Sequence, residues 1–278
     1  MNNKFMLNFT PTGMIPTKEM TPHVPVRVDE IVEEVNSVAK QGVTMVHLHA
    51  RDTETGKPTY KKEIYGELIC GIREEHPDLI VCVSTSGRDF SEFEKRSECL
   101  ELEGSLRPDF GSLTLSSLNF NKQASVNSPK MIQDLAHKMF HHGIRPELEA
   151  FDVGMINYAK YLIKKGLIKL PYYFNLILGN IACAQADILH LGLMIRELPE
   201  GSIWSVGAVG DFQLNMNICG ILAGGGVRIG LEDNIWFDAE RTTLASNRSL
   251  VERILHIAEV LGYTPYTPAE ARDLLQLS

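Results

Sequence analysis

The chain has 278 residues, a formal net charge of −8 and 44% hydrophobic residues, so its core can be large without disulfide or metal staples. The net negative charge argues against a surface that binds nucleic acid or an anionic membrane. No apolar run reaches the roughly 18 residues that a membrane span needs, so we expect no membrane partner.

In chain order, eight short apolar runs alternate with amphipathic segments, and the runs are rich in β-branched and aromatic residues, as strands buried on both faces are. The expected strands are Phe5–Thr10, Val43–His49, Leu79–Ser84, Phe110–Leu115, Pro146–Phe151, Tyr172–Leu178, Ile203–Val209 and Val227–Glu232. The expected helices are Val28–Lys40, Lys61–Glu75, Pro129–His141, Asn157–Lys165, Ala184–Glu197, Phe212–Ala223 and Ser246–Leu261, with a short terminal helix from Pro268.

This alternation predicts a parallel sheet with right-handed crossovers, and eight such units predict closure into an α/β TIM (β/α)8 barrel. An open, doubly wound sheet is the alternative. Such folds place a glycine-rich fingerprint after the first strand, and Thr10–Pro16 does not match one. No linker divides the chain. We expect residues 1–278 to form one barrel domain with a short helical extension from about residue 268.

The five cysteines are widely spread and form no C-x-x-C pair, which favours reduced thiols. The first ten residues are too short and too polar a stretch for a signal peptide. We therefore expect a cytoplasmic protein.

Two histidines stand at the end of the second expected strand, in the run Val46-His47-Leu48-His49. Residues i and i+2 of a strand face the same side, so His47 and His49 point together. TIM barrels place their chemistry at the C-terminal ends of the strands, where two imidazoles are a natural half of a metal site. Two hydrogen-bonded core histidines are the alternative, and the pair alone does not decide.

The eighth expected strand carries Arg228 and Glu232 on one face. In a closed barrel only the first strand separates this strand from the second, so Glu232 should lie near His49. A set of His47, His49 and Glu232 leaves open positions for substrate, as a catalytic zinc requires. A structural Arg–Glu ion pair is the alternative, but charges inside a barrel are costly without a partner or a metal.

Other polar residues are expected at the same end of the barrel. Ser84 ends the third strand and Thr114 lies near the end of the fourth. Hydroxyls at strand ends often only cap helices, which is the competing explanation. Glu147 and Glu149 share one face of the fifth strand, with Glu149 nearer the end. Two acidic residues on one inward face are hard to explain as packing.

Three runs of residues together carry a family resemblance. They read V-H-L-H-A-R-D at 46–52, R-P-E-L-E-A-F-D at 145–152 and V-R-I-G-L-E-D-N at 227–234. They resemble the β-keto acid cleavage enzymes, the family that includes 3-keto-5-aminohexanoate cleavage enzyme, and the likeness spans nearly the whole chain. It implies a TIM barrel, a homotetramer, and the conversion of a β-keto acid and acetyl-CoA into acetoacetate and a new acyl-CoA.

The resemblance also implies roles for single residues. The implied ligands of a Zn²⁺ ion are His47, His49 and Glu232. The family's catalytic aspartate matches Asp233, and its substrate-orienting arginine matches Arg228. Zinc and the arginine should keep Asp233 ionised. The remaining catalytic positions match Ser84, Thr114 and Glu149.

One departure concerns the substrate tail. The family member that acts on an amino-substituted acid has a glutamate shortly after the first strand, where this chain has Met14 and Ile15. We therefore expect uncharged or apolar β-keto acids to be preferred over amino-substituted ones.

Two other functions fit the same residues: a metal-dependent barrel hydrolase or aldolase, and a non-catalytic metal or acyl-CoA binding protein. Two histidines and a carboxylate also suit iron or manganese.

Overall fold

The eight expected strands pair in parallel and close into a barrel in the computed structural model, which describes residues 3–277. The TIM-barrel prediction is confirmed, and the open sheet is excluded. Around the barrel the order is β10 (Ser202–Ala208), β11 (Gly226–Ile229), β2 (Leu7–Phe9), β3 (Met45–Leu48), β4 (Ile80–Val83), β5 (Phe110–Thr114), β8 (Arg145–Ala150) and β9 (Tyr172–Leu178).

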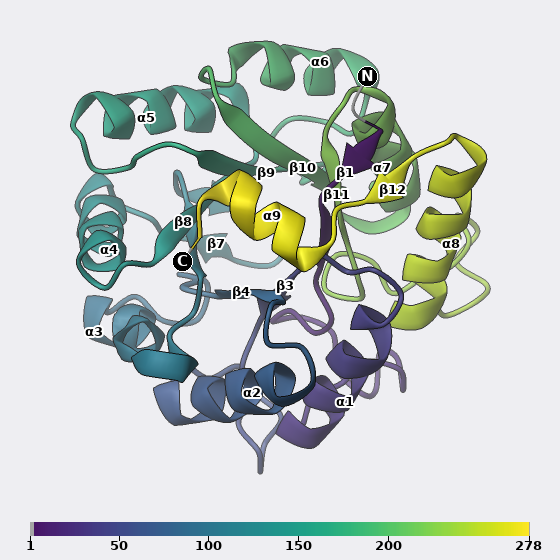
Figure 1. The fold of residues 1–278 in the computed structure, drawn as a ribbon, viewed down its shortest axis with the longest axis horizontal. Helices are drawn as coiled ribbons and strands as arrows, with labels where there is room; N and C mark the ends of the chain where they lie inside the picture. Colours follow the sequence, from purple (N-terminus) through teal and green to yellow (C-terminus); the bar gives the residue numbers. More distant parts are fainter. Residues whose placement is uncertain (1–2, 278) are drawn as a thin grey trace.

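A ring of helices surrounds the barrel (Figure 1). In chain order the ring contains α1 (Val28–Ala39), α2 (Lys62–Glu75), α3 (Phe93–Ser97), α4 (Pro129–His141), α5 (Val153–Lys164), α6 (Ile188–Glu197), α7 (Gln213–Leu222) and α8 (Asn247–Val260). Each longer helix buries an apolar stripe against the sheet; in α1 this stripe is Ile31, Val35 and Val38. Within residues 3–277, no helix combines the length and the apolar character that crossing a bilayer requires.

Capping residues explain where two helices differ from the expected bounds. The helix expected from Asn157 already begins at Val153, because the Asp152 side chain accepts a hydrogen bond from the Met155 N–H. The helix expected from Ala184 begins later, after Asp187 caps it in the same way. The sequence patterns also missed short elements: α3, the pair β6 (Leu118–Asn119) and β7 (Ala124–Ser125), and the pair β1 (Lys4–Phe5) and β12 (Thr264–Pro265).

The final helix, α9 (Pro268–Leu275), crosses the centre of the barrel in Figure 1. Its Ala271 and Leu275 are fully buried and belong to an apolar cluster with the barrel residues Met45 and Phe110. These barrel residues lie at the N-terminal ends of their strands. The helix therefore closes that end of the barrel. We call the opposite end, where the strands have their C-terminal ends, the mouth.

Candidate active site

The inner face of the barrel changes from apolar to polar toward the mouth. Along β3, Met45 belongs to the apolar cluster under α9, whereas His47 and His49 follow it on the same face. Along β5, Phe110 is followed in the same way by Ser112 and then Thr114. Polar and ionisable side chains therefore gather at the mouth, although most remain buried.

The structure brings together the three side chains expected to bind a metal. The Nε2 atoms of His47 and His49 are 3.3 Å apart, and Nε2 of His49 is 3.2 Å from Oε1 of Glu232. One ligand atom from each residue lies within 4.8 Å of the others. The second oxygen of Glu232, Oε2, is buried and has no hydrogen-bond partner. A small cluster with an unsatisfied carboxylate oxygen is a suitable environment for a cation.

Glu232 reaches this position from a turn, because β11 ends at Ile229 and is shorter than expected. The Glu232 N–H donates to the Thr10 carbonyl, which ties the turn to the end of β2. Gly13 has a φ of +65° and packs against Glu232; a Cβ at Gly13 would lie only 2.5 Å from the Glu232 Cγ. A glycine is therefore needed where this loop meets the carboxylate.

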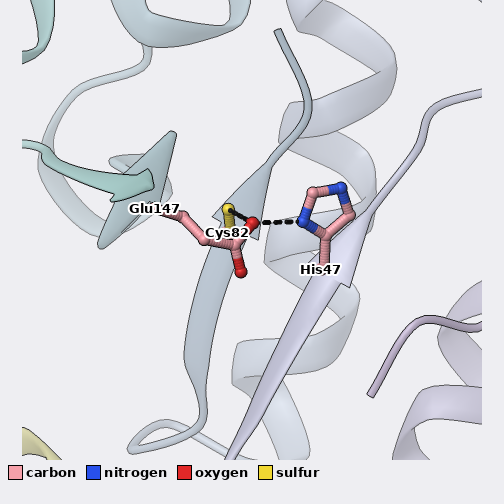
Figure 2. Close-up of side chains that lie close together, drawn as sticks. All are labelled: His47, Cys82 and Glu147. Atoms are coloured by element: carbon pink, nitrogen blue, oxygen red, sulfur yellow. Dashed lines mark hydrogen bonds and ion pairs between the residues drawn. The ribbon is translucent and has the colours of Figure 1, made fainter. Parts of the chain in front are cut away.

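Glu147 lies beside His47 and contacts its second ring nitrogen (Figure 2). Oε2 of Glu147 is 2.6 Å from Nδ1 of His47, and it also accepts a hydrogen bond from Sγ of Cys82 at 3.3 Å. The Asn8 amide donates to the other oxygen at 2.8 Å. A proton on Nδ1 of His47 leaves Nε2 free to bind a metal, so Glu147 orients the ligand from behind.

A second group of three residues, His47, Cys82 and Glu147, also meets the distance criterion for a metal. All three are fully buried below the mouth. Hydrogen bonds already join Glu147 to both of the other side chains. The group with His49 and Glu232 instead lies at the mouth and contains an unsatisfied oxygen. Geometry therefore favours the latter group as a site that substrate can reach.

Charges reinforce the pairing between His47 and Glu147. Burial disfavours a charged imidazole, but the Glu147 and Glu232 carboxylates outweigh it and raise the pKa of His47 to about 9, so a metal that binds Nε2 must displace a proton from this ring. Burial would likewise raise the pKa of Glu147, but His47 and then Arg228 lower it to about 2. Burial lowers the pKa of His49, which favours the neutral ring that a metal needs.

Arg228 is fully enclosed by acidic side chains. Its Nε donates to Asp233 at 2.9 Å, its Nη2 donates to Glu232 at 2.7 Å, and its Nη1 is 3.8 Å from Glu149. Gly207 on β10 makes room for the side chain, since a Cβ there would lie 3.1 Å from Arg228 carbons. Only Nη1 lacks a hydrogen-bond partner. Arg228 thus holds two acidic residues in place and keeps one donor group free.

Burial and Arg228 act in opposite directions on the pKa of Asp233. Burial raises this pKa and Arg228 only partly offsets the rise, while the expectation that zinc and the arginine together keep Asp233 ionised stays a prediction. Burial also raises the pKa of Glu149, whose Oε2 accepts a hydrogen bond from the Thr114 hydroxyl at 2.6 Å. The mouth therefore holds two carboxyl groups that gain protons more readily than usual, a property suited to general bases.

Among the described residues, Ser84 has no hydrogen bond to this cluster. It lines a small pocket at the mouth together with His49 and Met14. Its hydroxyl accepts a hydrogen bond from the Ser86 N–H at 3.3 Å, which is a turn contact. The pocket nevertheless joins the first loop of the chain to the proposed ligand His49.

The site contains more buried carboxyl groups than permanently charged cations, because among residues 3–277 Arg228 is the one guanidinium that pairs with them. Three carboxyl groups, those of Glu149, Glu232 and Asp233, lie within 4.0 Å of the Arg228 guanidinium, and a fourth, that of Glu147, pairs with His47. A divalent cation beside Glu232 would balance the excess negative charge, which is otherwise costly in a buried site. The donor set of two imidazoles and one carboxylate is one that zinc accepts.

Comparison with known families identifies the barrel. The model of the beta-keto acid cleavage enzyme family matches residues 4–277. The chain belongs to this family. The resemblance noted in the sequence motifs is thereby confirmed.

Full-length relatives in the family differ in their named substrates. The chain is 37% identical to 3-keto-5-aminohexanoate cleavage enzyme of Fusobacterium nucleatum, covering 100% of this chain and 99% of the relative. It is 34% identical to 3-oxoadipate:acetyl-CoA acetyltransferase of Cupriavidus necator, covering 100% and 96%. It is 30% identical to 3-dehydrocarnitine:acetyl-CoA trimethylamine transferase of Rhizobium meliloti, covering 100% and 98%.

Among solved structures, the barrel resembles ObcA in a ternary complex with a C4-CoA adduct and oxalate. The TM-score is 0.81 at 20% identity, covering 92% of this chain and 68% of ObcA. At this identity the likeness supports the fold alone.

Proposed function

We propose that the chain is a zinc-dependent enzyme that uses acetyl-CoA to cleave a β-keto acid, giving acetoacetate and a new acyl-CoA. The observation that carries the proposal is the placement of His47, His49 and Glu232 beside Arg228 and Asp233 at the mouth. Family membership supports it, as do the names of two relatives that include acetyl-CoA.

The proposed zinc ligands are His47, His49 and Glu232, with Glu147 holding His47 in position. The excess of buried carboxylates and the unsatisfied oxygen of Glu232 fit a divalent cation there. Bound zinc would supply Lewis acidity toward the oxygens of the keto acid.

Asp233 is proposed as the general base. The proton to be removed lies on C2 of the keto acid, between the carboxylate and the ketone, and is the most acidic C–H of the substrate. A carboxylate whose pKa is raised by burial is a better acceptor for this proton. Arg228 Nε holds the carboxylate at 2.9 Å, and its unpartnered Nη1 can donate to negative charge that develops on the substrate.

The remaining steps exchange one acyl group for another. The C2 carbanion attacks the thioester carbonyl of acetyl-CoA, a C–C bond forms, and CoA leaves as the thiolate. That thiolate attacks the original ketone carbon, and the bond from this carbon to C2 breaks. The electron pair returns to C2, which regains a proton from Asp233. The products are acetoacetate and the acyl-CoA of the substrate's former tail.

Ser84, Thr114 and Glu149 are proposed as further catalytic residues. The two hydroxyls can hold substrate oxygens, and Glu149 is the second base candidate because its pKa is also raised. Thr114 already orients Glu149 through a 2.6 Å hydrogen bond.

The loop after β2 supports a preference at the substrate tail. Met14 lies beside His49 in the pocket lining, and Ile15 is 51% exposed. An ammonium group there would lose water without gaining a counter-charge, whereas an alkyl tail would gain about 0.8 kcal/mol per buried methylene. We propose that uncharged or apolar tails are preferred over amino-substituted ones. A higher kcat/KM for 3-keto-5-aminohexanoate than for 3-oxohexanoate would contradict this.

An assay with and without acetyl-CoA tests the proposed function. A β-keto acid should be consumed only when acetyl-CoA is present, with acetoacetate and a new acyl-CoA formed in equal amounts. Consumption without acetyl-CoA would indicate a metal-dependent hydrolase or aldolase instead. Binding of metal or acyl-CoA with no turnover of a β-keto acid panel would indicate a binding protein.

We also propose that the protein is a cytoplasmic homotetramer. Light scattering on the purified protein tests the oligomeric state.

A further inference from the structure

Arg88 is a half-buried cation near the mouth whose side chain has no bonded partner. It lies in the loop that follows β4. Its guanidinium carbon is 3.6 Å from the centre of the Phe120 ring, which is a stacking contact. Its Nε is buried without a hydrogen-bond partner. Among residues 3–277, no carboxylate lies within 4.0 Å of its nitrogen atoms.

Other buried arginines of the mouth are fully engaged in holding the protein together. Arg51 donates to the backbone carbonyls of Gly13 and Pro16. Arg96 donates to the Thr85 carbonyl and to the Asn127 side chain. Within the described part of the chain, the Arg88 side chain donates no such hydrogen bond. Its guanidinium is held in place by stacking on Phe120, and its N–H groups remain free to bind a ligand.

Aromatic contacts connect the Arg88–Phe120 pair to the mouth of the barrel. Phe120 follows β6 and makes an edge contact with Phe151, with ring centres 6.0 Å apart, and Phe151 directly follows the mouth end of β8. Burial lowers the pKa of Arg88, while the carboxylates of Glu232, Asp89 and Glu149 raise it. Among the described residues, none of these carboxylates lies within 4.0 Å of an Arg88 nitrogen.

We propose that Arg88 binds a carboxylate at the tail of the substrate, so that the preferred substrate class is a β-keto diacid. This inference rests on the proposed function and adds the tail group to it. A guanidinium presents parallel N–H donors that match the two oxygens of a carboxylate, and stacking on an aromatic ring reduces the freedom lost on binding. Because Arg88 does not touch the proposed ligands or Glu149, its partner is the end of the substrate remote from the reacting carbons.

Two observations agree with an acidic tail. The Cupriavidus necator relative is named for 3-oxoadipate, a keto acid with a second carboxylate. Met14 and Ile15 in place of an acidic residue remove the group that would repel such a tail. Both this loop and Arg88 disfavour an ammonium; only Arg88 distinguishes an acidic tail from an alkyl tail.

The test compares two substrates of equal length, 3-oxoadipate and 3-oxohexanoate, at fixed acetyl-CoA. The native enzyme should give the higher kcat/KM with 3-oxoadipate. Arg88→Gln should lower kcat/KM for 3-oxoadipate about 10- to 100-fold, and leave 3-oxohexanoate within about twofold. Arg88→Lys should recover only part of the loss, because an ammonium lacks the planar fork. Arg196→Gln, at a side chain that is 80% exposed on α6, removes the same charge and serves as the control.

Three results would overturn the inference. An equal loss for both acids would assign Arg88 to the carboxylate that all β-keto acids share. A rise in KM for acetyl-CoA alone would assign it to a CoA phosphate. No loss for either acid would leave Arg88 a structural residue. If the native enzyme turns over neither these acids nor any other member of the β-keto acid panel, the proposed function fails; calorimetric titration with 3-oxoadipate alone then decides whether Arg88→Gln still weakens binding.

Discussion

Replacing Glu147 with glutamine isolates the effect of a residue behind the metal ligands. The substitution keeps the size of the side chain but exchanges one acceptor oxygen for an NH₂ group. In the native protein, Oε2 accepts from Nδ1 of His47 at 2.6 Å, while Oε1 accepts from Asn8. If NH₂ takes the place of Oε2, the His47 proton must move to Nε2, and that nitrogen then cannot bind a metal.

The expected loss follows from this exchange of hydrogen bonds. Removing a residue that orients a ligand typically weakens metal binding about 10- to 100-fold, equivalent to about 1.4–2.7 kcal/mol. We therefore expect Glu147→Gln to raise the zinc dissociation constant by this factor. Turnover at saturating zinc should be largely restored, because Glu147 is 0% exposed and does not contact substrate.

Competition with a chelator of known zinc affinity measures the dissociation constant, and circular dichroism checks that the variant is folded. Glu252→Gln on α8 is the matched control, because it makes the same chemical change at a side chain that is 50% exposed. A zinc affinity within about twofold of native would refute the orienting role. Turnover that stays low at saturating zinc would show instead that Glu147 acts in the chemistry.

Three further predictions concern the ligands, the base and a pair of surface ion pairs. His49→Ala should lose the one zinc expected per chain while remaining folded. Elemental analysis that shows full metal content in this variant would contradict the ligand assignment. Asp233→Asn should keep zinc but lose most turnover, because an amide cannot accept the C2 proton; near-normal turnover at saturating substrates would move the role of base to Glu149. Glu101, 41% exposed, forms ion pairs with Lys138 and Lys62 that lower its pKa from 4.5 to about 2. Its stabilising effect is thus present above its unfolded pKa and lost as pH falls through the folded pKa. Glu101→Gln should reduce the free energy of unfolding near pH 7 by about 1 kcal/mol at most. Urea unfolding near pH 3 should show a smaller difference, and an equal or larger one would contradict the pairing.

Period-two alternation was sufficient to predict much of the site. It placed His47 and His49 on one face, and the barrel topology then placed Glu232 within reach of them across β2. It also placed Glu147 and Glu149 on one face of the fifth strand, and in the structure Glu149 pairs with Thr114 in the register of β5 and β8. Such relations depend only on strand direction and neighbour order, which the sequence pattern carries.

Contacts across the barrel interior could not be predicted in this way. Glu147 reaches His47 from β8 to β3, two strands that share no hydrogen bonds, so the contact depends on the width of the closed barrel. The extent to which burial raises the pKa of Asp233 against the charge of Arg228 also depends on the closed barrel, and strand patterns do not carry it. The signal available for Glu147 was its acidic side chain on an inward face, and this indicated a partner without identifying it.

The exposed part of the mouth was also outside the reach of pattern analysis. The β6–β7 pair spans only a few residues and has no periodicity to recognise. Its neighbour Phe120 nevertheless supports Arg88, the residue to which we assign recognition of the substrate tail. Charge alone did not distinguish Arg88 from Arg51 or Arg96; the bonds that each one makes did.

The proposed reaction is tested most directly by following the acetyl group. The zinc-loaded protein is given 3-oxoadipate or 3-oxohexanoate together with acetyl-CoA labelled in its acetyl carbon atoms. The proposal predicts that the label appears in the ketone half of acetoacetate, and that the new acyl-CoA carries the unlabelled tail of the keto acid. Loss of the keto acid with the label remaining in acetyl-CoA, or released as acetate, would contradict it.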